Sequence, residues 1–299
     1  MLNKLGATIF LGQGEVQRGK ESEQRMHLLV APDDPPVGHQ NIPQDIPQEI
    51  TEQVDPAVSD TSVPGRAKCV PPIKISLRPG EKYPWKRQYL LKPEALGAIQ
   101  PLLSRFLKHG LIRPCQFPCN SPILHVQRPN GEYRLLQDLQ AANEAVIPVH
   151  TLVPNPYTLL VQVPGKSQYF FVLDLKDVFF CIPLHPDSQY LFAFEWRDAD
   201  TLEATRYTWT TLPQGFRDSP HLFRNALARE LRELSLEKGT LLQYVDDLLI
   251  SSETKQDSDQ NSVRVLNFLA KRGYKVSPNK AQISQQWVPY LGFVLTPGT

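Results

Sequence analysis

The chain has 299 residues, 41% of them hydrophobic and 21% charged, which is enough for one or two domains with a substantial core. Its 32 Lys and Arg residues balance 31 Asp and Glu residues, so the net charge of +1 neither indicates nor excludes a nucleic-acid partner. No apolar run reaches the ~18 residues of a membrane span, no secretory signal opens the chain, and the 4 cysteines show no pairing pattern. These features argue against membrane-spanning and disulfide-rich secreted proteins, and we expect a soluble, intracellular protein of the cytoplasm.

The first 72 residues differ in composition from the rest. Residues 1–30 are too few to fold alone. In residues 31–72 proline recurs among Gln, Asp, Glu and Ser, with few large apolar side chains. Such a segment cannot bury enough apolar surface to offset the loss of chain entropy. We therefore predict an extended linker with little fixed structure at 31–72, followed by a folded region at 73–299.

The folded region mixes helical and strand patterns. Pro101–His109 has apolar side chains at helical spacing and precedes Gly110, a typical C-terminal cap. Ser219-Pro220 is a typical helix start. No regular strand–helix–strand rhythm is present, so the pattern favours an α+β fold. The other predicted elements are strands at Tyr169–Leu175, Leu241–Tyr244, Leu248–Ser251 and Val288–Leu295, and a helix at Ser262–Arg272 closed by Gly273.

An acidic turn lies between two of the predicted strands. Tyr244-Val245-Asp246-Asp247 is flanked by apolar residues, which predicts a hairpin whose turn presents two carboxylates. Adjacent like charges repel, and a bound cation would remove that cost. Hard oxygen ligands suit Mg²⁺ or Mn²⁺. By itself this pattern also fits an ordinary Asp-containing turn.

Asp174 makes the metal-site interpretation stronger. It ends the apolar run Phe171-Val172-Leu173, where an acidic side chain on a buried strand needs a reason. One strand-end aspartate and a hairpin Asp-Asp can supply the carboxylates of a two-metal site for phosphoryl transfer. Asp177 follows three residues later, and it either belongs to the same site or caps the helix after it.

Three segments in this order resemble the catalytic motifs of retroviral reverse transcriptases. They are Val172–Phe180, Leu212–Pro220 and Tyr244–Asp247. Phe192–Trp196 and Leu212–Pro220 are most similar to the gammaretroviral, murine leukaemia virus type, and the resemblance runs from about Pro71 to Leu295.

This resemblance implies a fold and an activity. The fold would be the fingers and palm of a right-hand polymerase, with a small antiparallel palm sheet backed by helices. The activity would be RNA-directed DNA polymerisation with two Mg²⁺ (or Mn²⁺) ions. The partners would be an RNA or DNA template with its primer and deoxynucleoside triphosphates, and no membrane; the oligomeric state stays open.

The resemblance also implies roles for matching residues. Asp174, Asp246 and Asp247 would be the catalytic metal ligands. Arg134 and Arg128 would contact the triphosphate, where guanidinium groups offer paired donors. Phe179 would exclude ribonucleotides at the sugar 2′ position, although its pattern alone fits a core aromatic. The other implied roles are Gln214 beside the nucleotide, Lys280 as a proton donor to pyrophosphate or else a solvated surface lysine, and the primer grip Tyr290, Leu291, Gly292 and Phe293.

Two departures from the family stand out. Gln140 occupies a position that is normally Arg, which removes a charge expected near the template. The chain also stops after the primer grip, so the thumb, connection and RNase H domains are expected to be missing. At the other end, Leu2–Phe10 resembles the C-terminal helix and strand of a retroviral protease, without Asp-Thr-Gly or Asp-Ser-Gly. We therefore expect residues 1–30 to be a protease remnant in a truncated endogenous retroviral Pol fragment.

Two further hypotheses compete with an active polymerase. The chain could be a catalytically inactive remnant that still binds nucleic acid, which the missing thumb and Gln140 favour and the intact aspartates oppose. It could also be a fragment that assembles with a separately encoded thumb.

Overall fold

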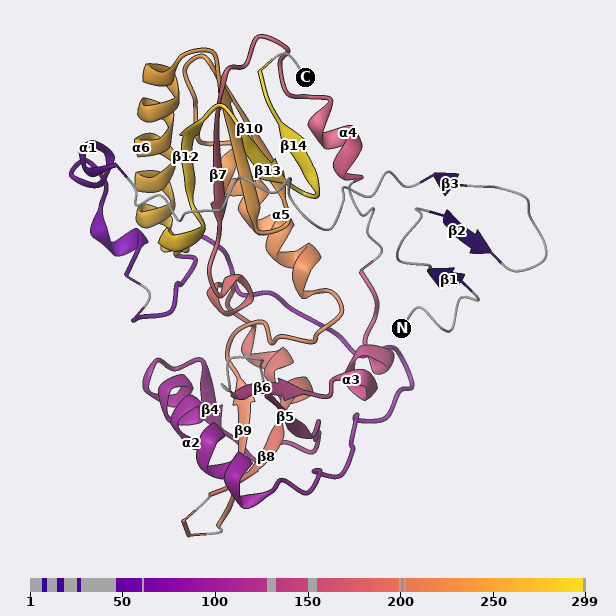
Figure 1. The fold of residues 1–299 in the computed structure, drawn as a ribbon. Helices are drawn as coiled ribbons and strands as arrows, with labels where there is room; N and C mark the ends of the chain where they lie inside the picture. Colours follow the sequence, from indigo (N-terminus) through magenta and orange to yellow (C-terminus); the bar gives the residue numbers. More distant parts are fainter. Residues whose placement is uncertain are drawn as a thin grey trace.

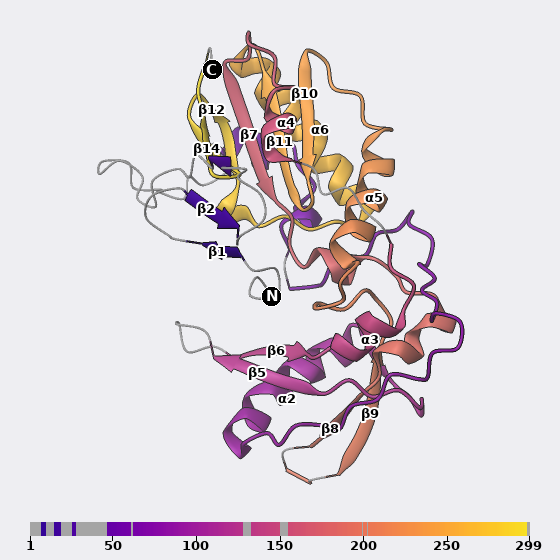
Figure 2. The same ribbon diagram turned by 90° about the vertical axis from the view of Figure 1, so that its right-hand side faces the viewer.

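The computed structural model describes residues 7–9, 15–18, 26–27, 47–60, 62–127, 133–149, 155–198, 200–201 and 203–297. They form two lobes, one above the other in Figure 1. The upper lobe contains a four-stranded sheet with two long helices, and the lower lobe contains smaller sheets beside a third long helix (Figures 1 and 2). We call them the palm lobe and the fingers lobe, after the parts that the resemblance predicts. Helices and antiparallel sheets together confirm the α+β class.

The palm sheet is entirely antiparallel and has the strand order β10-β11-β7-β12. The side chains of β7 alternate between two apolar clusters: Phe171 and Leu173 belong to the larger one, and Phe170 and Val172 to the smaller. Burial on both faces explains why β7 is apolar without interruption. The strands are β7 (Tyr169–Asp174), β10 (Gly239–Tyr244), β11 (Asp247–Ser252) and β12 (Gln282–Gln285).

Each face of the palm sheet has its own cover. The helices α5 (Ser219–Leu231) and α6 (Lys255–Arg272) pack on the larger cluster. The helix α4 (Pro156–Leu160) and the hairpin of β13 (Val288–Tyr290) and β14 (Phe293–Leu295) contribute to the smaller one. The prediction that α6 ends at Gly273 is confirmed, since Gly273 is its left-handed C-cap, but the helix begins earlier than predicted, after the N-cap Thr254.

The fingers lobe is built around α2 (Pro93–Lys108). The predicted helix start at Pro101 is wrong: Pro93 occupies the first turn, and Pro101 lies inside the helix, where it cannot donate the usual hydrogen bond. Gly110 follows the C-cap residue with φ 63°, so the predicted end is confirmed. The other elements are β4 (Ile112–Pro114), β5 (Ile123–Gln127), β6 (Tyr133–Gln137), α3 (Gln140–Ala145), β8 (Phe194–Arg197) and β9 (Ala204–Trp209).

Residues 47–60 and 62–77 form a strap along the palm lobe, which contradicts the predicted lack of fixed structure wherever 31–72 is described. Ile50 in α1 (Gln48–Thr51) and Val58 in the 3-10 helix η2 (Pro56–Val58) are buried in the larger cluster. The N–H groups of Arg66 and Lys68 donate to the carbonyls of Gly273 and Arg272. The strap then continues towards the fingers lobe (Figure 1). Residues 31–46 lie outside the described part.

The shorter elements complete the chain. They are the 3-10 helices η3 (Val178–Cys181), η4 (Pro186–Phe192) and η5 (Pro278–Lys280), and an antiparallel sheet of β1 (Ala7–Ile9), β2 (Glu15–Arg18) and β3 (Met26–His27). No helix in the described part combines the length and apolar character that crossing a bilayer would need. The assignment of residues 1–30 to a protease remnant stays a prediction.

Candidate active site

A two-residue turn joins β10 to β11 and presents the first acidic side chain. Tyr244 pairs with Asp247, which leaves Val245 and Asp246 as the turn. Val245 has φ 52°, a left-handed conformation that a β-branched residue adopts only under strain. Strained backbone of this kind is concentrated at functional sites. The predicted hairpin is therefore present, with Asp247 already on the strand.

The three aspartates lie at one end of the central strands. Asp174, the last residue of β7, pairs directly with Asp247 of β11. The N–H of Leu175 donates to the carbonyl of Asp246 at 3.2 Å. Asp174 and Asp247, 73 positions apart in sequence, are thus neighbours in register, which is the juxtaposition that the sequence predicts for a triad of carboxylates.

The site is electrostatically unfavourable for negative charge. Burial raises the pKa of Asp247 to about 6, with further contributions from the charges of Asp246 and Asp174. Burial also raises the pKa of Asp246, and the charge of Asp174 acts in the same direction. A divalent cation would offset both causes, because it stabilises the ionised carboxylates.

Lys280 supplies a cation that contacts a triad carboxylate. Its ammonium donates a hydrogen bond to Asp174, and that bond is the main cause of the raised pKa of Lys280. Lys280 is the last residue of η5, and the N–H of the N-cap residue Ser277 donates to the Asp174 carbonyl at 3.0 Å, which holds η5 beside Asp174. The predicted lysine therefore contacts Asp174 with a side chain that is 69% exposed, and its role as a proton donor to pyrophosphate stays a prediction.

The donor chemistry fits Mg²⁺ or Mn²⁺, since three carboxylates meet at one strand end. Their side chains are not gathered into a closed metal-binding group: within the described residues no three carboxylate, imidazole or thiol side chains are arranged to hold an ion. One oxygen of Asp174 is engaged by Lys280 instead. The ammonium of Lys280 and a metal ion would therefore share the Asp174 carboxylate or compete for it.

The predicted nucleotide-binding residues are placed less completely. Arg128 lies outside the described residues. Arg134 is in β6, paired with Val126, and the structure describes only its backbone. Gln214 is half-buried in the loop before α5 and lines a cavity of about 640 Å³ together with Lys176 and Asp177.

Two alternatives from the sequence can be examined at the start of η3. Asp177 occupies its N-cap position with φ 51°, but its side chain makes no capping hydrogen bond. Phe179 is half-buried and meets Phe223 edge-on, with ring centroids 6.4 Å apart. The ring of Phe179 is therefore in contact with the core, and its implied role at the sugar stays a prediction.

The predicted primer grip is a hairpin beside the triad. Tyr290 pairs with Phe293, and the turn residues Leu291 and Gly292 both have positive φ, as a type I′ turn requires. The hydroxyl of Tyr290 donates to the carbonyl of Asp247 at 3.3 Å. The hairpin therefore contacts the strand that carries the triad.

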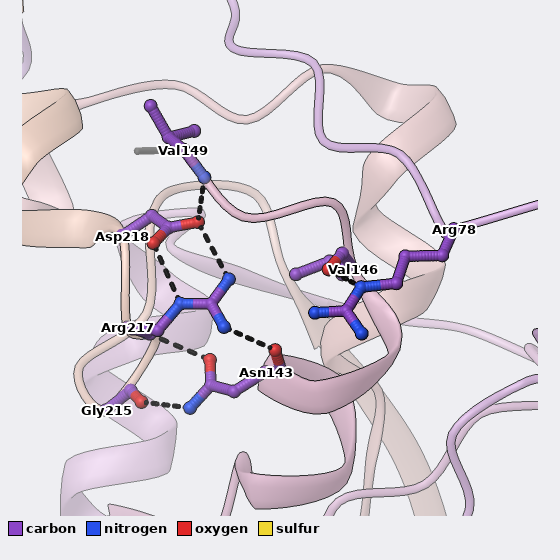
Figure 3. A network of polar contacts seen from close by, with 7 residues as sticks. All are labelled: Arg78, Asn143, Val146, Val149, Gly215, Arg217 and Asp218. Carbon is purple, nitrogen blue, oxygen red and sulfur yellow. Dashed lines mark hydrogen bonds and ion pairs between the residues drawn. The ribbon is translucent and has the colours of Figure 1, made fainter. Parts of the chain in front are cut away.

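A polar network next to Gln214 was not predicted from the sequence. Arg217 and Asp218 pair with each other and reach Asn143 of α3 and Val149 (Figure 3). The Arg-Asp dipeptide was visible in the sequence, but nothing there indicated Asn143. Gln140, at the start of α3, is exposed and bonds to Glu144.

Comparisons with known proteins identify the family of this chain. The family described as "Reverse transcriptase (RNA-dependent DNA polymerase)" matches residues 126–295. The foamy viral protease–reverse transcriptase in complex with RNA/DNA hybrid has a TM-score of 0.71 at 28% identity, covering 84% of this chain and 33% of that one. The same protein in complex with double-stranded DNA has a TM-score of 0.68 at 29% identity, covering 79% of this chain and 39% of that one. The chain belongs to the reverse transcriptase family.

Its relatives are gammaretroviral Pol and Gag-Pol polyproteins, as the resemblance predicts. The Pol polyprotein of feline endogenous virus ECE1 is 46% identical over 81% of this chain and 23% of that protein. The Gag-Pol polyprotein of woolly monkey sarcoma virus is 47% identical over 78% of this chain and 14% of its own length. That of baboon endogenous virus is 40% identical over 100% of this chain and 18% of its own. The chain thus spans less than a quarter of each.

Proposed function

We propose that this chain catalyses RNA-directed DNA synthesis, adding deoxynucleotides to a primer on an RNA or DNA template. The observation that carries the proposal is the register of Asp174 opposite Asp247, with Asp246 in the adjoining turn. This arrangement brings three carboxylates to one strand end, where burial and the neighbouring negative charges raise the pKa values of Asp246 and Asp247.

In the proposed reaction the primer 3′-oxygen attacks the α-phosphorus in line, and the bond from that phosphorus to the pyrophosphate oxygen breaks. Two Mg²⁺ or Mn²⁺ ions held by Asp174, Asp246 and Asp247 would supply the charge that neutralises both oxygens. Most of the remaining catalysis is positioning. Arg134 and Arg128 would bind triphosphate oxygens, Gln214 and Phe179 would border the nucleotide, and Lys280 would donate a proton to pyrophosphate.

The hairpin around Leu291 and Gly292 would hold the primer end. Its contact with β11 through Tyr290 ties the primer position to the strand that carries Asp247. A small displacement of this hairpin would therefore misplace the attacking oxygen. Misplacement by about 1 Å can lower the reaction rate by about a hundredfold.

The test is extension of a labelled primer on an RNA template, first with Mg²⁺ and then with Mn²⁺. Asp246→Asn keeps the shape of the side chain and removes the charge. Asp187→Asn is the matched control, because Asp187 pairs only with Lys74 and His185 at an exposed site. We expect extension by the wild type and by Asp187→Asn and at least about a hundredfold less by Asp246→Asn. Equal extension by the wild type and Asp246→Asn would exclude the proposed triad.

The inactive nucleic-acid-binding remnant is the second candidate. The Lys280–Asp174 pair favours it, since an ammonium engages one oxygen of a triad carboxylate. This candidate predicts retained binding of a template–primer duplex with no extension in either metal by correctly folded protein. Fluorescence anisotropy of the duplex, read beside the extension assay, separates the two.

A further inference from the structure

The loop of residues 213–218 is tied to the fingers lobe by one asparagine. The Asn143 amide in α3 makes two hydrogen bonds to it: its oxygen accepts from the N–H of Arg217 at 2.9 Å, and its nitrogen donates to the carbonyl of Gly215 at 3.1 Å (Figure 3). These two groups lie on either side of Phe216, so a single side chain fixes both ends of a three-residue stretch. Gln214 is the residue immediately before that stretch.

The Arg217 side chain adds a second tie. Its Nη1 donates to the main-chain carbonyl of Asn143 at 2.9 Å. Its Nε and Nη2 donate to the two oxygens of Asp218 at 3.0 and 3.3 Å. Bidentate guanidinium–carboxylate pairs of this kind fix orientation as well as distance. The guanidinium therefore links α3 to the first turn of α5.

Asp218 is used in an uncommon way. It holds the N-cap position of α5, where an aspartate normally accepts from a helical N–H, but its side chain makes no capping bond. Its carboxylate, only 6% exposed, instead accepts from Arg217 and from the N–H of Val149 at 3.2 Å. The buried carboxylate of Asp218 therefore does not cap α5. It connects the start of α5 to Val149 and, through Arg217, to α3.

The loop backbone packs closely against β6 at Gly215. Gly215 has φ 92°, and an added Cβ would meet the carbonyl of Gln137 at 3.2 Å. Phe216 is buried with its ring against Phe192, at a centroid distance of 5.1 Å. The loop is therefore held from the side of β6 as well as from α3, and any loosening of the polar ties is transmitted to its neighbour Gln214.

We propose that Asn143, Arg217 and Asp218 are positioning residues that hold Gln214 in place for the incoming nucleotide, so that they set nucleotide affinity without touching the nucleotide. The inference rests on the proposed polymerase function. The contacts of Asn143, Arg217 and Asp218 run between the fingers lobe and the palm lobe, and we call these three residues the joint. The joint therefore also couples the fingers lobe to the position of the nucleotide. Loosening it lowers affinity for the nucleotide, while the triad on β7 and β11 is left as it is.

The central variant is Asn143→Ala, and the chain offers a close control. Asn267 in α6 makes the same pair of bonds to the strap: its oxygen accepts from Asp55 N–H at 2.8 Å and its nitrogen donates to the Gln53 carbonyl at 2.9 Å. Asn267→Ala therefore removes an equivalent pair of hydrogen bonds at a site far from Gln214. Both variants are expected to lower the urea midpoint similarly.

The decisive readout is nucleotide affinity on a duplex whose primer is chain-terminated, so that no chemistry occurs. The complementary deoxynucleoside triphosphate is titrated, and protection of the backbone amides of residues 214–218 from hydrogen exchange gives Kd. We expect Kd to rise about three- to tenfold in Asn143→Ala and to stay within about twofold in Asn267→Ala. In extension assays KM should rise by the same factor with kcat nearly unchanged.

A second variant pair tests the ion pair. Asp218→Asn should raise Kd, because it leaves Arg217 without its counter-charge, and Arg217→Lys should also raise it, because ammonium lacks the planar fork. Their effects should be clearly non-additive in the double variant. Equal effects of Asn143→Ala and Asn267→Ala on Kd, or no effect of either, would overturn the positioning role.

The two proposals fail separately. If the wild type binds the nucleotide but never extends a primer, the proposed function is contradicted. The positioning role of Asn143, Arg217 and Asp218 is then judged from the Kd values of the variants alone. A wild type that shows no nucleotide-dependent protection of 214–218 contradicts the inference, whatever the extension assay gives.

Discussion

The ammonium of Lys280 is hydrogen-bonded to the carboxylate of Asp174, a residue 106 positions earlier in the chain. The pair is partly open to water, with side-chain exposures of 69% and 21%. It places a fixed cation on an oxygen that a divalent ion would use. We therefore expect Lys280 and a metal ion to compete for Asp174 in the absence of nucleotide.

Replacing Lys280 by glutamine should tighten metal binding. Exposed pairs contribute about 0.2–1 kcal/mol, so Mn²⁺ affinity should rise at most about fivefold. Titration calorimetry with Mn²⁺ alone measures this directly. Lys255→Gln is the control, because Lys255 makes a similar pair with Asp259 at 2.8 Å away from the triad. Unchanged or weaker Mn²⁺ binding in Lys280→Gln would show that the two cations do not compete.

Gly273 and Gly97 should respond in opposite directions to alanine. Gly273 has φ 86°, and a Cβ there would lie 1.9 Å from the carbonyl oxygen of Arg66. Gly273→Ala should cost at least about 2 kcal/mol, since left-handed backbone alone costs about 1–2 kcal/mol. Gly97 lies inside α2 with open space around its Cβ position, so Gly97→Ala should stabilise by about 0.5–1 kcal/mol. Urea unfolding gives both values, and a neutral Gly273→Ala would contradict the close approach of the strap.

Tyr274 is expected to stabilise the packing of α5 against α6 through a polar contact. Its buried hydroxyl donates to Glu230, which also lies 3.4 Å from Arg272. Tyr274→Phe keeps the edge contact of the ring with Phe223 but leaves a buried carboxylate oxygen without its donor. The loss should be about 1–3 kcal/mol in urea unfolding. Tyr157→Phe, at a site 64% exposed, should change stability by less than about 0.5 kcal/mol; comparable losses in both would rule out the buried contact as the cause.

Asp138 should make the fingers lobe sensitive to acid. Burial raises its pKa, but hydrogen bonds from Lys86, Tyr89 and the Gln140 N–H outweigh burial and hold the pKa below its ordinary value. A carboxyl with a lowered folded pKa contributes stability above its unfolded pKa of about 4, and that contribution disappears as pH falls through the folded value.

The measurement is the difference in unfolding free energy between the wild type and Asp138→Asn as a function of pH. We expect Asp138→Asn to be less stable at pH 7 and the difference to shrink steadily below about pH 4. A difference that is constant over this range, or that grows at low pH, would contradict the assigned direction of the pKa shift.

Local chemistry made part of this structure predictable. The Asp-Asp turn, the Ser219-Pro220 helix start and the Gly273 cap each depend on residues within a few positions, and each lies where the sequence indicated. The predicted start of α2 is wrong because a proline often marks the first turn of a helix and Pro101 fits that pattern. In the structure Pro93 lies in the first turn, and the helix accommodates Pro101 in its interior.

Contacts between distant segments were not predictable in the same way. The strap has a Pro-rich composition, yet its backbone N–H groups and carbonyls bond to residues near Gly273, and backbone groups carry no sequence signature. The bonds from Asn143 to Arg217 and from Lys280 to Asp174 also depend on the folded topology. Side-chain type alone indicated neither partner.

The strap limits where this reverse transcriptase family domain can be trimmed. Val276 N–H donates to the carbonyl of Val58 at 2.9 Å, and Val276 in turn pairs with Leu175, the neighbour of Asp174. The family match begins only at residue 126. A recombinant fragment that begins at residue 126 would lose α2 and would expose the residues around Val276 and Leu175 that the strap covers. We therefore expect the shortest stably folded fragment to begin near Pro47.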